Sequence, residues 1–273
     1  LIRAAIREDV GAGDLTSRVL VPADAIARAV IAARRPCVLA GLAVAAEVFR
    51  RMDRRVRCEY ARRDGEEIGA GDIAMSLKGP ARALLAGERT ALNFLQRLSG
   101  IATFTRQFVR RVEGTGVMIL DTRKTTPGWR RLEKYAVRCG GGRNHRLGLY
   151  DQVLIKDNHR KLWGGRAARR SLADAVREAR RRCPGRVIEI EVDNERELLD
   201  AIEGQPDWIL LDNMPPARLR RCVELVRGRA RLEASGRVRL SNVRAVAATG
   251  VDAISIGALT HSAPAADLGM DFL

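Results

Sequence analysis

From residue 117 onward, short apolar runs and amphipathic segments follow one another in a regular order. Apolar runs predict buried strands at 117–120, 153–155, 186–192, 208–211, 231–234 and 252–256. Segments with apolar residues at three- and four-residue spacing predict helices at 129–139, 171–182, 195–203, 216–227 and 242–249. This alternation predicts a parallel sheet, because each crossover helix returns the chain to the same end of the sheet.

Polar residues and glycine follow nearly every one of these strands: Asp121, Lys156, Glu191, Asp212, Ser235 and Gly257. An open, doubly wound sheet would concentrate such residues at one switch point, whereas a barrel distributes them around its mouth. In strand 186–192, Glu189 and Glu191 alternate with apolar residues and would point into the lumen. Lys124 and Lys156 are their candidate partners, because buried carboxylates require compensation. The pattern favours a closed barrel.

The first 105 residues have a more mixed pattern, which predicts a small α+β unit. Strands are expected at 29–31, 38–39, 55–60 and 81–85, a turn at 14–17, and helices over the first ten residues and at 44–52. A helix is expected from Gly87, with a break at Ser99 and Gly100 and a second helix from 101 to 112. Arg89 and Arg106 would then each lie near a helix start.

Composition places the chain among globular proteins. It has 273 residues, 46% of them hydrophobic and only 4% aromatic. No apolar run approaches the roughly 18 residues of a membrane span, and the first residues show no secretory pattern. The five cysteines are scattered, without the spacing of a metal site. These features predict reduced thiols and a cytoplasmic protein that has no membrane partner.

The formal net charge of +16 raises the alternative of a nucleic-acid-binding protein. The arginines, however, are spread over nearly every predicted helix and alternate with acidic residues. Few aromatic residues are present to stack on bases. The distribution therefore favours solvated helix faces over a nucleic-acid partner.

Cationic side chains are concentrated between residues 121 and 159: Arg123, Lys124, Arg143, His145, Arg146, Lys156 and His159. Arginine binds carboxylate and phosphate through two parallel hydrogen bonds, and lysine supplies a point charge. Glu191 and Asp212 form a separated acidic pair that suits Mg²⁺ and a phosphorylated sugar. Glycine loops at 234–237 and 256–261 suit a monophosphate. The expected ligand is therefore small and carries several negative charges.

These blocks, in this order, closely resemble the quinolinate phosphoribosyltransferase family. The resemblance is carried by 121–128 (DTRKTTPG), 139–142 (CGGG), 145–151 (HRLGLYD) and 154–159 (LIKDNH). It extends to 11–17 (GAGDLTS), 87–95 (GERTALNFL), 189–193 (EIEVD), 210–213 (LLDN), 249–252 (TGVD) and 257–262 (GALTHS). The likeness covers the whole chain, which makes it far more specific than any single motif.

The resemblance implies two domains: an N-terminal α/β sandwich at 1–105, joined by the tail 264–273, and an open six-stranded TIM-like α/β barrel at 106–263. It implies a homodimer with shared active sites, which pairs into hexamers in some members. The implied reaction converts quinolinate and 5-phosphoribosyl-1-diphosphate into nicotinate mononucleotide, diphosphate and CO₂, in de novo NAD biosynthesis.

The resemblance also implies roles for individual residues. Arg123, His145 and Arg146 would bind quinolinate carboxylates, together with Arg89 of the partner subunit. The catalytic residues would be Lys124, Lys156, Glu191 and Asp212, with Mg²⁺ near the two acids. The phosphate loops would contain Ser235, Gly236, Gly257 and His261.

One residue departs from the family pattern. Arg237 follows Ser235 and Gly236 where the family has Gly or Asn, so a positive φ there would be strained. Alternatively, its side chain adds a phosphate contact. Two related activities also stay open: a nicotinate-specific phosphoribosyltransferase and a paralogue associated with molybdate transport.

Overall fold

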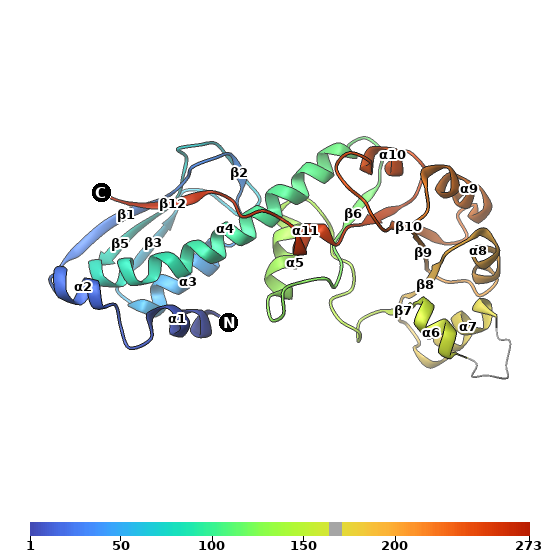
Figure 1. Ribbon diagram of the computed structural model, residues 1–273, viewed down its shortest axis with the longest axis horizontal. Coiled ribbons are helices and arrows are strands. Elements are labelled where there is room, and N and C mark those ends of the chain that lie inside the picture. Colours follow the sequence, from blue (N-terminus) through green and yellow to red (C-terminus); the bar gives the residue numbers. More distant parts are fainter. Residues whose placement is uncertain (164–170) are drawn as a thin grey trace. The chain divides into compact units, whose positions relative to one another are not determined.

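The computed structural model describes residues 1–163 and 171–273. The chain forms two compact units (Figure 1). Unit 1 comprises Leu1–Arg106, Lys124–Gly142 and Ala258–Leu273, and unit 2 comprises Gln107–Arg123 and Arg143–Gly257. The boundaries expected from the resemblance differ from this division at 106, 124–142 and 258–263, all of which belong to unit 1.

Unit 1 is built on an antiparallel four-stranded sheet with the order β12-β1-β5-β3. Its strands are β1 (Ile26–Ala33), β3 (Arg57–Tyr60), β5 (Ile73–Pro80) and β12 (Leu268–Phe272). The last strand pairs with β1, so the end of the chain lies in the N-terminal sheet. A separate two-stranded sheet joins β2 (Cys37–Val38) and β4 (Glu67–Ile68).

The helices of unit 1 are α1 (Ile2–Val10), α2 (Leu15–Leu20), α3 (Leu42–Met52), α4 (Ala81–Arg111), α5 (Arg130–Cys139) and α11 (Ala258–His261). The core includes the fully buried side chains of Phe49 on α3, Met75 on β5 and Leu84 on α4. Trp129, just before α5, stacks on Phe94 of α4 with ring centroids 4.6 Å apart. Apolar packing thus attaches α5 to unit 1.

Three predictions for the N-terminal region were wrong. Residues 81–85 are helical, because β5 ends at Pro80 and the following alanines and leucines are strong helix formers. Helix α4 continues through Ser99 and Gly100, so Arg89 and Arg106 lie within it and not near helix starts. The expected turn at 14–17 is the beginning of α2, where the Asp14 side chain caps the helix by accepting the Ser17 N–H at 3.1 Å.

Unit 2 contains a parallel six-stranded sheet with the order β6-β11-β10-β9-β8-β7. Its strands are β6 (Met118–Leu120), β7 (Val153–Ile155), β8 (Ile188–Val192), β9 (Trp208–Asp212), β10 (Arg231–Ser235) and β11 (Ala253–Ser255). β6 and β7 are consecutive in the chain but form the two edges of this sheet. The barrel is therefore open, as the resemblance implied, and not closed as the polar pattern alone favoured.

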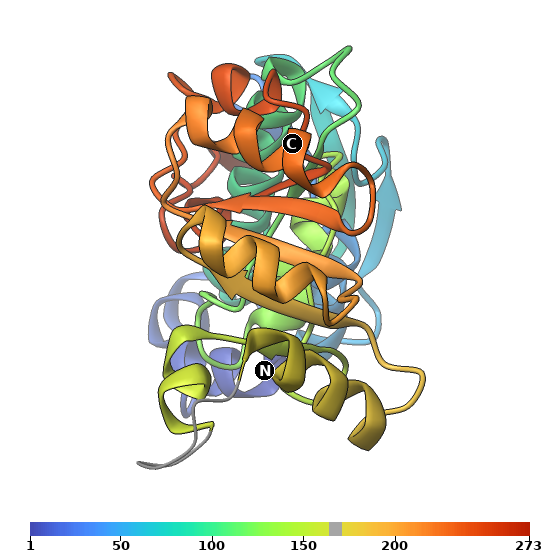
Figure 2. The same ribbon diagram turned by 90° about the vertical axis from the view of Figure 1, so that its right-hand side faces the viewer.

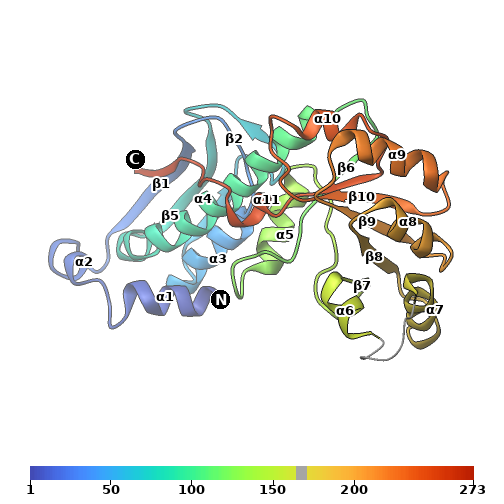
Figure 3. The same ribbon diagram turned by 45° about the vertical axis from the view of Figure 1, so that its right-hand side comes forward.

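Helices α7 (Leu172–Arg182), α8 (Glu195–Ile202), α9 (Pro216–Val226) and α10 (Val243–Ala247) follow the outer side of this sheet (Figures 2 and 3). The short helix α6 (Asp157–Leu162) follows the carboxyl end of β7. Ile188, Ile190 and Val192 of β8 are fully buried, and α7 and α8 pack against this strand. The predicted alternation of β8 is confirmed: Glu189 and Glu191 are also buried, and they lie on its opposite face. None of the described helices is long and apolar enough to cross a membrane.

Candidate active site

Most of the predicted site residues belong to unit 2. Those at or after the carboxyl ends of its strands are Arg123, Lys156, Glu191, Asp212, Ser235, Gly236 and Gly257, whereas His145 and Arg146 lie in the loop between α5 and β7. The carboxyl ends of parallel strands form the usual ligand-binding side of an α/β barrel.

Lys156, Glu191 and Asp212 form one charged group there. Lys156 Nζ lies 3.0 Å from Glu191 Oε2, which confirms the predicted pairing of these two residues. Burial and the charge of Glu191 raise the pKa of Asp212, whereas the charge of Lys156 lowers it. Two carboxylates and one ammonium group thus share a partly desolvated position.

The backbone of Lys156 is held in place by the following helix. Lys156 is the N-cap residue of α6, and its N–H donates to His159 Nδ1 at 2.9 Å. Arg160 of the same helix donates to the Glu191 main-chain oxygen at 2.9 Å and pairs with Glu197 at 2.7 Å. Helix α6 therefore connects the ends of β7 and β8, which carry the paired side chains.

His145 does not face solvent but faces two buried carboxylates. Its Nε2 lies 3.0 Å from Glu189 Oε2 and 3.4 Å from Glu233 Oε2, and the three side chains are 9%, 1% and 2% exposed. Within unit 2 Glu189 is paired with His145, whereas Lys124, one of the predicted partners of the lumen carboxylates, belongs to unit 1. Glu233 was not among the site residues predicted from the sequence. Its position in a predicted strand, as a charged residue between the apolar Leu232 and Ala234, was the feature that could have indicated it.

The two carboxylates alter the acid–base behaviour of His145. Burial opposes a charged imidazole, but the hydrogen bonds and charges of Glu189 and Glu233 outweigh it and raise the pKa of His145 to about 10. Burial and the charge of Glu233 also raise the pKa of Glu189. His145 Nδ1 accepts the Arg146 N–H at 2.7 Å, and Nε2 faces both carboxylates. This arrangement favours a hydrogen on Nε2.

A buried aspartate positions the loop that carries His145 and Arg146. Asp121 directly follows β6 and is fully buried. It accepts the His145 N–H at 2.9 Å and Asn144 Nδ2 at 2.5 Å. The backbone of Arg143 forms an isolated parallel β-bridge with Leu120, so this loop runs beside the edge strand β6. The predicted polar residue after the first barrel strand thus has a structural role.

Arg123 and Arg146 are close enough to repel one another. Burial and the charge of Arg123 lower the pKa of Arg146, which is only 9% exposed. Two guanidinium groups in a partly desolvated position are unfavourable in the absence of an anion. Because arginine binds carboxylates through two hydrogen bonds, the pair suits a ligand with more than one carboxylate.

The loops after β9 and β10 are in close contact. Asn213 donates its N–H to the Ser235 oxygen at 2.9 Å, and a Cβ atom at Gly236 would lie 2.2 Å from Asn213 Oδ1. Only glycine fits at position 236, which also has a φ of +95°. Arg237 has a φ of +52°, so the strained backbone anticipated at this departure from the family pattern is present.

Two groups of side chains are candidates to hold a metal ion. Glu191 and Asp212 fit Mg²⁺, which takes one or two protein carboxylates and completes its coordination with substrate phosphates and water. A cation there would also relieve the repulsion that raises the pKa of Asp212. Possible ligand atoms of His145, Glu189 and Glu233 lie within 4.8 Å of one another. In this cluster His145 Nε2 already pairs with one oxygen of each acid, whereas the other oxygens, Glu189 Oε1 and Glu233 Oε1, are buried without a hydrogen-bond partner among the described residues.

Arg89, Lys124 and His261 belong to unit 1. The main-chain oxygen of Lys124 accepts a hydrogen bond from Thr260 Oγ1 at 2.7 Å, so α11 anchors the backbone of this lysine. His261 is exposed, and its Nδ1 lies 2.6 Å from Ser262 Oγ. Arg89 is exposed on α4.

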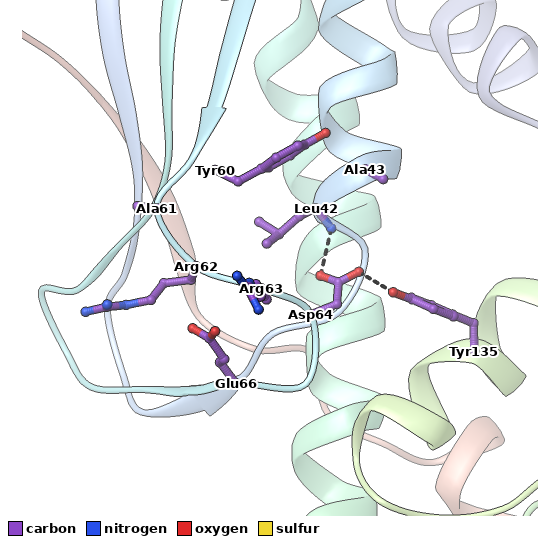
Figure 4. Close-up of a pocket in the computed structure, with 9 residues that line it drawn as sticks. All are labelled: Leu42, Ala43, Tyr60, Ala61, Arg62, Arg63, Asp64, Glu66 and Tyr135. Atoms are coloured by element: carbon purple, nitrogen blue, oxygen red, sulfur yellow. Dashed lines mark hydrogen bonds between the residues drawn. The ribbon is translucent and has the colours of Figure 1, made fainter.

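Unit 1 also contains an open pocket of about 650 Å³, shown in Figure 4. Asp64 in this pocket accepts the N–H groups of Gly41 and Leu42 at the start of α3, and the Tyr135 hydroxyl at 2.7 Å. These bonds satisfy the carboxylate within the chain. None of the predicted site residues lines the pocket.

Comparison with known proteins decides the family. The model of the quinolinate phosphoribosyl transferase C-terminal domain matches residues 101–271, and that of the N-terminal domain matches residues 14–99. The chain belongs to the quinolinate phosphoribosyltransferase family. The family resemblance inferred from the sequence motifs is thereby confirmed.

Relatives in this family match almost the whole chain. A probable nicotinate-nucleotide pyrophosphorylase [carboxylating] of Bacillus subtilis is 44% identical over 97% of this chain and 89% of its own length. The nicotinate-nucleotide pyrophosphorylase [carboxylating] of Mycobacterium leprae is 43% identical over 99% of this chain and 95% of its own. The solved structure of the enzyme from Francisella tularensis has a TM-score of 0.93 and 38% identity, and covers 100% of this chain and 94% of its own.

Proposed function

We propose that the mouth of the unit 2 barrel binds quinolinate and 5-phosphoribosyl-1-diphosphate and converts them into nicotinate mononucleotide, diphosphate and CO₂. Membership of the quinolinate phosphoribosyltransferase family supports this reaction, which belongs to NAD biosynthesis. The observation that carries the assignment of the site is the proximity of two guanidinium groups, those of the partly buried Arg123 and of Arg146, which is 9% exposed. Quinolinate carries two carboxylates and would neutralise both.

The proposed mechanism begins with substitution at C1 of the sugar. The pyridine nitrogen forms a bond to C1 as the bond from C1 to the diphosphate oxygen breaks, and positive charge develops on the ribose. Glu191 stabilises this charge, and Lys124 and Lys156 neutralise the leaving diphosphate. Arg123 and Arg146 hold the carboxylates so that the nitrogen faces C1.

Decarboxylation follows on the same ring. The bond between C2 and its carboxylate breaks, CO₂ leaves, and the electron pair stays on C2, where the quaternised nitrogen stabilises it. A proton then adds to C2. No side chain forms a covalent intermediate, so the residues act by positioning and by charge.

Mg²⁺ is the proposed cofactor, with Glu191 and Asp212 beside it and substrate oxygens as its main ligands. When bound, it supplies positive charge that stabilises the diphosphate leaving group. Ser235, Gly236, Gly257 and His261 are proposed to surround the 5-phosphate, as implied by the family pattern.

The proposed assembly is a homodimer in which Arg89 of each subunit completes the site of the other, with a hexamer as the larger alternative. The proposed location is the cytoplasm. All five cysteines are free thiols, which supports a reducing compartment.

The reaction is tested by measuring CO₂ release. With 5-phosphoribosyl-1-diphosphate and Mg²⁺ present, carboxyl-labelled quinolinate is expected to yield labelled CO₂ and nicotinate mononucleotide in equal amounts. Nicotinate is the control acceptor, because it lacks the 2-carboxylate that one of the arginines binds. Efficient mononucleotide formation from nicotinate, without turnover of quinolinate, would support the nicotinate-specific alternative instead.

Replacing Arg237 by glycine is expected to raise the free energy of unfolding by about 1 kcal/mol, because glycine adopts a positive φ without strain. Urea denaturation measures this change. Arg227 at the end of α9 has a φ of +50°, so Arg227→Gly is the matched control and should give a similar gain. An increase in the KM for 5-phosphoribosyl-1-diphosphate in Arg237→Gly alone would show that the side chain contacts a phosphate. A lower free energy of unfolding in Arg237→Gly than in the wild type would show that the backbone at position 237 is not strained.

A further inference from the structure

Glu189 is the centre of a buried hydrogen-bond network in unit 2. Its side chain is 1% exposed, and its Oε2 lies 3.0 Å from His145 Nε2. The same oxygen accepts Gln152 Nε2 at 2.6 Å. One carboxylate oxygen thus anchors two side chains from the loop between α5 and β7.

Both of these neighbours also contact Arg146. His145 Nδ1 accepts the Arg146 N–H at 2.7 Å, and the Gln152 main-chain oxygen accepts Arg146 Nη1 at 3.2 Å. The first contact fixes the backbone of Arg146, and the second fixes its guanidinium. Glu189 therefore supports both the backbone and the guanidinium of Arg146, although it forms no hydrogen bond with Arg146 itself.

Arg146 needs such support because its position is intrinsically unfavourable. It is nearly buried and is repelled by Arg123, and an unrestrained arginine would turn its charged head towards water. The negative charge of Glu189 also acts on Arg146 over a longer range. Thus hydrogen bonds, together with an electrostatic attraction, keep the guanidinium in the site before any substrate binds.

We propose that Glu189 is a positioning residue for quinolinate, which holds Arg146 ready to bind a substrate carboxylate. Glu233 assists from β10 as the second acceptor for His145 Nε2, so that the ring keeps its hydrogen on that nitrogen. This inference rests on the proposed function, because it assumes that Arg146 binds quinolinate.

Two variants of Glu189 test the inference. Glu189→Ala removes the acceptor of both His145 and Gln152, and is expected to raise the KM for quinolinate by about 10²-fold, as a displacement of about 1 Å does at a binding site. The KM for 5-phosphoribosyl-1-diphosphate should change by less than about threefold. Glu189→Gln keeps one acceptor oxygen and should recover most of the affinity for quinolinate. Steady-state kinetics with each substrate varied in turn gives these values.

The imidazole of His145 provides a readout that does not depend on turnover. The chain has only three histidines, so the ring nitrogens are resolved by ¹⁵N NMR and assigned with a His145→Gln variant. The wild-type protein should show a preference for hydrogen on Nε2, which faces both carboxylates. In Glu189→Ala this preference should be lost, whereas Glu189→Gln should retain it.

A variant of Asp252 is the matched structural control. Asp252 Oδ2 accepts the Leu232 N–H at 2.7 Å, next to Glu233 in the chain, so Asp252→Asn weakens β10 without touching the His145 cluster. It should leave the KM for quinolinate and the His145 spectrum unchanged. An equal loss for both substrates in Glu189→Ala, or the same loss in Asp252→Asn, would show a purely structural role and overturn the inference. If the wild type turns over quinolinate and Glu189→Ala has an unchanged KM, the inference fails while the proposed function stands.

Discussion

Replacing Arg123 by alanine is expected to lower kcat/KM for quinolinate by about 10³-fold while the fold remains intact. A charged, hydrogen-bonded contact in a desolvated site contributes about 2–5 kcal/mol, and each 1.4 kcal/mol is a factor of about ten. Arg123 repels Arg146 in the structure, so its removal also relieves that repulsion. Steady-state kinetics and the thermal unfolding midpoint together measure the two effects.

Arg177→Ala is the matched control for Arg123→Ala. Arg177 lies on α7 and pairs with Asp174 at 2.9 Å on an exposed surface, where such a pair contributes at most about 1 kcal/mol. Its loss should leave turnover unchanged. If Arg123→Ala kept kcat/KM within about threefold of the wild type, Arg123 would not be a substrate ligand, and the dicarboxylate site would have to be placed elsewhere.

Gly100→Ala is expected to destabilise the protein by about 2–3 kcal/mol, although alanine normally strengthens a helix by about 1 kcal/mol. A Cβ atom at position 100 of α4 would lie 2.0 Å from the Pro264 main-chain oxygen and 3.0 Å from Ala265 Cα. Both contacts are with backbone atoms, so a rotamer change cannot relieve them. Differential scanning calorimetry or urea denaturation measures the loss.

Gly87→Ala in the same helix separates this effect from helix propensity. A Cβ atom there would lie 3.0–3.2 Å from side-chain atoms of Phe49 and Met52, which can move by a few tenths of an ångström. Its effect on the free energy of unfolding should be within about 1 kcal/mol of zero. Similar losses in the two variants would mean that the backbone approach at Gly100 is not the cause.

The barrel strands were predictable because their apolar residues form continuous runs. The predicted segments 153–155, 208–211 and 231–234 coincide with β7, β9 and β10 to within one residue. The alternation within β8 also predicted that Glu189 and Glu191 share the inner face, and both are buried there. Period-two patterning contains this information directly, since successive side chains point to opposite faces of a strand.

The long helix α4 was not predictable in the same way. Gly100 predicts a break in the helix, because glycine is unfavourable within an isolated helix. In the folded chain it is required by the close approach of the segment Pro264–Ala265, which is distant in sequence. A tertiary contact therefore overrides the local preference.

The contacts between site residues were likewise only partly predictable from the sequence. Sequence position indicated that Lys156 and Glu191 would meet, because both lie at the ends of neighbouring parallel strands. It did not indicate that His145 faces Glu189 and Glu233. His145 lies in a loop, where no regular period relates a residue to the strand that its side chain will contact.

The sequence by itself determined the order of the six barrel strands, the inner face of β8, the concentration of cations after β6 and the family resemblance. The polar pattern favoured a closed barrel and the resemblance an open one, and the tertiary structure decided for the open barrel. Only the tertiary structure decided that α4 is continuous and that Glu189 contacts His145 and Gln152, which in turn contact Arg146. The reason is physical: periodicity and strand ends are local properties of the chain, whereas barrel closure and hydrogen-bond partners depend on segments that meet only after folding.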